Sequence, residues 1–174
     1  MDVNSVVVSV AGVAGTLGAA LLTQRQAERA KRREIDLLRR LDEARDELTL
    51  RRTCYVEVNR DARMFNTALN HHLHVMRERP VNDADKQALD DAKAAHRDRH
   101  SQVQMIAPDQ VLMLASAANQ ALNSVYGQVK RLERGEPGPG DTVESASRAQ
   151  SEIWDRLREM RRAMRQDLGV QPPP

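Results

Sequence analysis

The sequence predicts an all-α protein in which an N-terminal transmembrane helix continues into a long helix and an antiparallel four-helix bundle. Three observations lead to this fold class. An uncharged run of seventeen apolar or small residues, Val6–Leu22, lies near the start of the chain. The remainder is rich in Ala, Leu, Arg, Glu, Asp and Gln and contains only four aromatic side chains. Apolar residues there recur at steps of three and four, the spacing of helices that pack on one another.

The run Val6–Leu22 predicts a membrane segment. As a helix it spans about 25 Å, slightly less than the roughly 30 Å hydrocarbon core of a bilayer, and counting from Val3 reaches the usual minimum length. A basic cluster follows it, formed by Arg25, Arg29, Lys31, Arg32 and Arg33. Because Lys and Arg are retained on the cytoplasmic side, we expect a single-pass protein of the cell membrane with its N-terminus outside and its bundle in the cytoplasm. The basic cluster would then face anionic lipid.

Two other interpretations of this run remain open, a cleaved signal peptide and a buried or interfacial helix. A signal peptide needs a basic region before its apolar core and a small-residue cleavage site after it, and the chain begins with Asp2 instead. Within the run, small residues recur every fourth position at Ala11, Gly15 and Ala19. This pattern is a candidate packing face for two membrane helices, although small residues are also common in such segments.

One apolar register predicts a seam along the helix that follows. The seam runs through Leu37, Leu41, Ala44, Leu48, Arg51, Tyr55, Val58, Ala62, Phe65, Leu69, His72 and Met76. Its alternating steps of four and three are typical of a coiled coil or a helical bundle, within one chain or between chains. Neither Gly nor Pro occurs between Gly18 and Pro80, so we expect one helix to about Glu78. A bend near residues 49–53 is the alternative.

A second helix is expected over residues 83–106. Arg79-Pro80 ends the first helix, because the residue before a proline disfavours the α conformation. Asn82 is a good N-cap for the next one. The expected inward stripe is rich in alanine and consists of Ala84, Ala88, Ala92, Ala95, Val103 and Ile106.

Two more helices flank the linker GEPGPGD at residues 135–141. The third runs from Pro108 to Arg134 and faces inward with Val111, Leu114, Ala118, Leu122, Val125, Val129 and Leu132. A capping box of Asp141 and Glu144 begins the last helix, which runs to Leu168. Its inward residues are Ala146, Ala149, Ile153, Leu157, Met160 and Met164.

These elements divide the chain into four parts. Residues 1–24 form the anchor and 25–50 a juxtamembrane basic helix. The cytoplasmic bundle covers 51–169, with its linker at 135–141, and residues 170–174 form a disordered proline-rich tail.

The histidines are the only candidates for a metal site. His71 and His74 are three residues apart, and His96 and His100 four apart, spacings that place two imidazoles on one helix face. If the turn between the helices centres near Val81, the two pairs lie roughly 8 Å or more apart along the helices. The segment HRDRH is typical of a solvated face of alternating charge. We therefore expect no metal and no cofactor.

No catalytic motif occurs in the sequence. It lacks a Gly-rich phosphate loop, G-x-S-x-G, H-E-x-x-H and C-x-x-C. The single cysteine, Cys54, has no evident base partner and fits a reducing cytoplasm. The arginine-rich stretch 156–165 is interpreted as the exterior of an amphipathic helix. An enzyme, a nucleic-acid-binding protein and a protein with a small-molecule substrate are therefore not expected.

Three segments carry a resemblance to known sequences. They are R-R-x-x-Y at Arg51–Tyr55, V-x-M-I-A-P-x-x-V at Val103–Val111 and R-R-A-M-R-Q-D-L-G at Arg161–Gly169. The chain resembles a group of small, uncharacterised actinobacterial proteins with a membrane-anchoring helix, a basic juxtamembrane helix and a helical domain. The resemblance implies a membrane location and a host type, and no activity is assigned to the group.

The sequence thus favours a membrane-anchored helical scaffold or adaptor that acts by protein–protein interaction, with a partner protein or a second copy of itself. The alternative is a membrane-linked regulatory or sensor module in which the long helix is coupled to the bundle. A change of pairing at the polar seam residues Arg51 or His72 would be the signature of that alternative.

Overall fold

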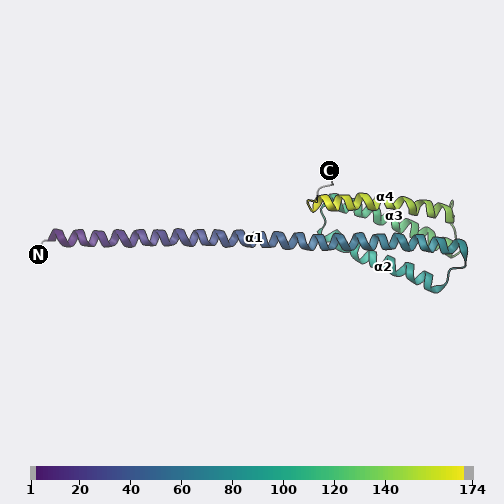
Figure 1. The fold of residues 1–174 in the computed structure, drawn as a ribbon, viewed down its shortest axis with the longest axis horizontal. Coiled ribbons are helices and arrows are strands. Elements are labelled where there is room, and N and C mark those ends of the chain that lie inside the picture. Colours follow the sequence, from purple (N-terminus) through teal and green to yellow (C-terminus); the bar gives the residue numbers. More distant parts are fainter. Residues whose placement is uncertain (1–2, 171–174) are drawn as a thin grey trace. The chain divides into compact units, whose positions relative to one another are not determined.

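The computed structural model describes the backbone of residues 3–170, and the side chains of Glu28 and of residues 31–170. Within these residues the chain contains four helices and no strand (Figure 1). The helices are α1 (Val3–Glu78), α2 (Asp83–Ile106), α3 (Asp109–Glu133) and α4 (Val143–Asp167). The predicted all-α class is confirmed. α1 is helical throughout residues 49–53.

The chain divides into two compact units, residues 1–47 and residues 48–174. The described part of the first unit belongs to α1, and every side chain from 31 to 47 is exposed. In the second unit the remainder of α1 packs with α2, α3 and α4 (Figure 1). The prediction of a helical bundle is confirmed for this second unit.

All four helices supply residues to one core in the second unit. Phe65 and Leu69 from α1 and Leu122 from α3 are fully buried in it. The core also contains Val58, Ala62, Leu89, Val103, Val111, Val125, Val129, Ile153, Leu157, Met160 and Met164. Since full burial of a large apolar side chain stabilises a fold by about 1.5–3 kcal/mol, this shared core fixes how the four helices pack.

The start of α2 is determined by a capping residue next to it in the sequence, Asn82. Asn82 accepts a hydrogen bond from the backbone of Asp85 at 2.9 Å, and the Asp85 carboxylate accepts one from the backbone of Asn82 at 3.0 Å. This reciprocal capping satisfies donors that the first turn of a helix otherwise leaves free. The predicted N-cap is confirmed.

The predicted capping box at the start of α4 is wrong by one residue. Thr142 and Ser145 form the box, with both reciprocal hydrogen bonds at 3.0 Å. Asp141 is engaged elsewhere, because its carboxylate accepts hydrogen bonds from Arg131 Nε at 2.7 Å and from the backbone of Gly138 at 2.9 Å. That carboxylate therefore holds the linker against α3.

The predicted inward face of α2 is wrong for three of its alanines and right for Val103, which is fully buried. Ala84, Ala88 and Ala95 are exposed, and the buried face consists of Leu89, His96, His100 and Val103. Alanine buries little area, so the helix turns toward the core the face that carries its larger side chains.

The predicted location in the cell membrane, as a single-pass protein with its N-terminus outside and its bundle in the cytoplasm, needs correction. Across the described part of the chain, no helix combines the length and the apolar character that a bilayer crossing requires. The run Val6–Leu22, with its packing face of Ala11, Gly15 and Ala19, lies outside the described side chains, as do Arg25 and Arg29.

Candidate functional site

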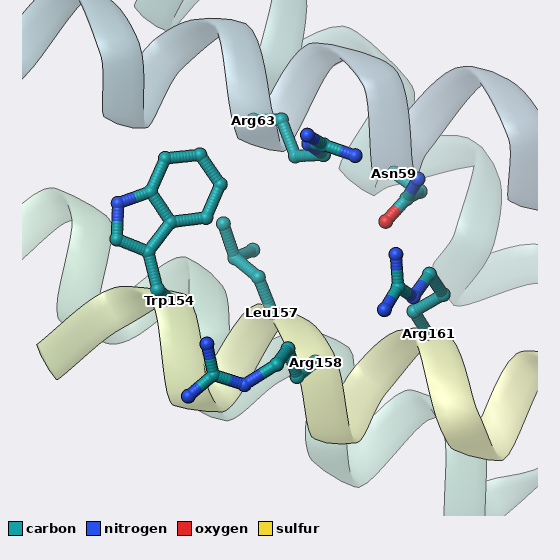
Figure 2. Close-up of a pocket in the computed structure, with 6 residues that line it drawn as sticks. All are labelled: Asn59, Arg63, Trp154, Leu157, Arg158 and Arg161. Atoms are coloured by element: carbon teal, nitrogen blue, oxygen red, sulfur yellow. The ribbon is translucent and has the colours of Figure 1, made fainter.

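A hollow on the surface of the bundle lies between α1 and α4, and we call it the Arg–Trp pocket. Its volume is about 190 Å³. From α4 come side chains at positions i, i+3, i+4 and i+7, which share one helix face, and from α1 come two side chains one turn apart. The lining residues are Asn59 and Arg63 on α1, and Trp154, Leu157, Arg158 and Arg161 on α4 (Figure 2).

One end of the pocket is aromatic and the other is cationic. The Arg63 guanidinium carbon lies 5.7 Å from the centre of the Trp154 ring, within the range of a cation–π contact. Leu157 lies between Trp154 and Arg161 and is almost fully buried (Figure 2). Arg161 reaches from α4 toward Asn59 on α1 (Figure 2). The hollow therefore places an apolar wall next to polar and cationic groups.

The pocket carries a net positive charge. Of its three guanidinium groups, that of Arg158 is paired with Asp155 one turn earlier on α4. Among the described residues, Arg63 and Arg161 form no ion pair with a carboxylate. The three guanidinium groups together with the Asp155 carboxylate give a net charge of two positive units. Such an arrangement suits the binding of an anion, and the six lining side chains include no carboxylate, imidazole or thiol for proton transfer.

The predicted seam is divided between two environments. Tyr55 and Phe65 are buried in the bundle core, whereas Leu37, Leu41 and Leu48 are each at least half exposed. The sequence register is continuous across this change. The described members of the predicted basic cluster are all exposed on α1, namely Lys31, Arg32 and Arg33.

The interpretation of the HRDRH segment as a solvated face holds for the exposed Arg97 and Asp98 and is wrong for its two histidines. His96 and His100 are buried, and their rings lie 6.0 Å apart. His96 also lies 5.8 Å from the Phe65 ring. Burial lowers the pKa of His96 to about 4 and also lowers the pKa of His100. These imidazoles therefore serve as neutral core side chains, while His71 and His74 are exposed.

The described residues include no group of three or more His, Cys, Asp or Glu side chains that could hold a metal ion. His72 is fully buried on α1, with Nε2 3.5 Å from the Glu133 carboxylate on α3. Burial lowers its pKa, and the Glu133 charge opposes that shift. His72 thus contacts the Glu133 carboxylate from a fully buried position.

A second hollow, of about 270 Å³, lies beside Cys54 and is mostly apolar. Its other lining residues are Leu50, Thr53, Glu57, Gln102, Met105 and Ile106. Burial raises the pKa of the Cys54 thiol, and the Glu57 charge raises it further. The thiol is therefore held in its unreactive protonated form.

Sequence reasoning did not identify the Arg–Trp pocket. The spacing of Trp154, Arg158 and Arg161 was a usable signal, because it places an aromatic ring and two cations on one face of α4. Asn59 and Arg63 could not be added from sequence, since their place depends on how α1 packs against α4.

No protein-family model, no curated protein and no solved structure matches this chain. The resemblance to the actinobacterial group stays a prediction, and the functional argument rests on the geometry of the chain itself.

Proposed function

We propose that this chain is a helical scaffold or adaptor, not an enzyme, and that it acts by binding a partner protein or a further copy of itself. The observation that carries the proposal is an exposed apolar face on α1. Leu37, Leu38 and Leu41 are 60%, 54% and 58% exposed. An apolar stripe of this kind on a helix is characteristic of a surface that packs against another helix.

The spacing of this face supports a helical partner. Leu37, Leu41 and Ala44 are separated by four and three residues, the steps by which side chains of one helix insert between those of another. Charged residues occupy positions 39, 40, 42 and 43, and Leu38 extends the apolar stripe on one side. Burying one leucine stabilises an interface by about 1.5–3 kcal/mol, which favours association over exposure to water.

We also propose that the second unit is an antiparallel four-helix bundle. The contacts between α1 and α4 support this arrangement. Arg51 and Tyr55, early in the bundle part of α1, contact Asp167 at the end of α4. Arg77, at the end of α1, donates a hydrogen bond to Ser147 at the start of α4. Pairs in this order fit helices that run in opposite directions.

Site-specific photo-crosslinking tests the interaction function. A photoreactive amino acid is placed at Leu41 in the full chain, in its native cells, and the crosslinked products are identified by mass spectrometry. We expect one dominant polypeptide, either a second copy or a partner. The matched control is the same probe at Arg39, which lies on the opposite side of α1 and is expected to give little product. Absence of any crosslinked polypeptide at both positions would overturn the proposal.

A second candidate is a regulatory module that changes its helix pairing at the polar seam residues. Both of these residues face a carboxylate on another helix, Arg51 opposite Asp167 at 3.4 Å and His72 opposite Glu133 at 3.5 Å. Arg51→Leu is then expected to hold one pairing state and to change the oligomeric state or the cellular phenotype. The exposed neighbour Arg52 provides the control, Arg52→Leu. If both properties are unchanged in Arg51→Leu, this candidate fails.

A further inference from the structure

We propose that the Arg–Trp pocket binds a small oxyanion, a carboxylate or a phosphate, that is carried on an apolar or aromatic group. This inference is independent of the exposed face of α1, because the pocket residues all belong to the second unit. It therefore stands or falls separately from the scaffold function.

The cationic end provides the affinity for the anion. Arg63 and Arg161 approach the hollow from different helices, and neither is paired with a carboxylate among the described residues. A guanidinium group matches the geometry of a carboxylate or a phosphate, to which it can donate two parallel hydrogen bonds. The Asn59 side chain adds an amide that can donate to the same anion. An oxyanion would also relieve the repulsion between like charges.

The aromatic end accounts for the apolar part of the ligand. Trp154 and Leu157 form this part of the lining. An engineered apolar cavity of about 150 Å³ holds a benzene ring, so a hollow of about 190 Å³ has space for one group of that size. The pocket is thus suited to a compact ligand with a ring or short apolar chain next to its charge.

Two other described hollows lack this charge pattern. The apolar hollow beside Cys54 includes Glu57, and a third hollow, between α3 and α4, places Glu159 next to Arg162. A carboxylate in the lining cancels or reverses the local positive charge. The Arg–Trp pocket is therefore the one of these three that favours an anion.

Trp154 makes the proposal directly testable, since it is the only tryptophan of the chain. Fluorescence of the full-length protein, excited near 295 nm, is recorded at constant ionic strength while phenyl phosphate, phenylacetate or the neutral benzyl alcohol is added. We expect a saturable change with at least one of the two anions, with a Kd of about 1 mM, and none with benzyl alcohol. A response to phenyl phosphate alone identifies a phosphate ligand, and a response to phenylacetate alone a carboxylate.

Variants locate the binding. Arg161→Gln and Arg63→Gln are each expected to weaken it by about tenfold, because each removes one charged donor from a partly solvated site. The matched control is Arg156→Gln, which removes the same charge from an exposed position of α4 outside the pocket and is expected to change Kd less than about twofold.

Far-UV circular dichroism establishes that the variants are folded. Three results would overturn the proposal: no saturable change with either anion, an equal response to benzyl alcohol, or an equal loss in Arg156→Gln.

Discussion

Acid is expected to destabilise the bundle, because His96 is buried in its neutral form. The side chain is 2% exposed. Loss of solvation lowers its pKa to about 4, and the charge of His100 acts in the same direction. Asn119 and Asp61 favour the protonated form but do not offset the burial. Protonation of His96 therefore works against the folded state.

The size of the effect follows from the two pKa values. In the unfolded chain a histidine has a pKa of about 6.5, so between pH 6.5 and 4 the unfolded chain binds a proton that the folded chain does not. The free energy of unfolding consequently falls as the pH falls through this window and levels off below pH 4. For His96 alone the loss is about 2 kcal/mol at pH 5 and about 3 kcal/mol at pH 4. His72 and His100, whose pKa values are also lowered, add to it.

Urea unfolding of the full chain at pH 7 and pH 5, followed by far-UV circular dichroism, measures this loss. His96→Leu replaces the titrating group with an apolar side chain of similar size. Wild type is expected to lose about 2 kcal/mol more than His96→Leu between the two pH values. The control is His71→Leu, at an exposed position of α1, which should keep the wild-type pH dependence. Equal losses in wild type and His96→Leu would refute the reasoning.

Three further substitutions or reactions test the packing of the bundle. Tyr55→Phe removes a hydroxyl that donates to the Asp167 carboxylate at 2.8 Å, and urea titration should show a loss of about 1–2 kcal/mol. An unchanged unfolding free energy would contradict a structural role for this hydrogen bond. Phe65→Ala leaves a cavity at a fully buried site and should lower the free energy of unfolding by about 3–5 kcal/mol in the same titration. A decrease below about 1 kcal/mol would contradict the central position of Phe65 in the core. Cys54 is buried and its thiol pKa is raised. DTNB at pH 8 should therefore react at least about tenfold more slowly with the native protein than with the urea-unfolded protein. Equal rates would disprove the burial of Cys54.

The ends of the helices could be predicted because they depend on neighbouring residues. Pro80 disfavours helix before it, Asn82 caps the helix after it, and Gly135 adopts a positive φ of 72° just beyond α3. The start of α4 was misplaced by one residue because Asp141 had a competing partner, Arg131, ten residues away. The predicted helix start was therefore wrong where a residue with a local capping preference instead binds a side chain from another helix.

The faces of the helices were harder to predict than their ends. For α2, an alanine stripe and a stripe of larger side chains were both compatible with helical spacing, and the second is buried because His96 packs against Phe65. The seam shows the same limit. Leu41 and Phe65 belong to one register, yet only Phe65 is buried, because a heptad pattern specifies that a face is apolar and not which chain covers it.

The polar contacts between α1 and α4 explain how the two halves of the Arg–Trp pocket come to face each other. Inside the core, the Gln150 amide donates to the Asn66 side chain at 3.1 Å, and Tyr55 donates to Asp167 farther along. A slip of one helical turn moves a side chain by about 5.4 Å, which would break both hydrogen bonds and leave buried polar groups without partners. Apolar residues alone tolerate such a slip better, because one leucine can replace another in the same groove. Buried polar pairs can therefore fix the register of two helices, and here that register brings Arg63 opposite the Trp154 face of α4.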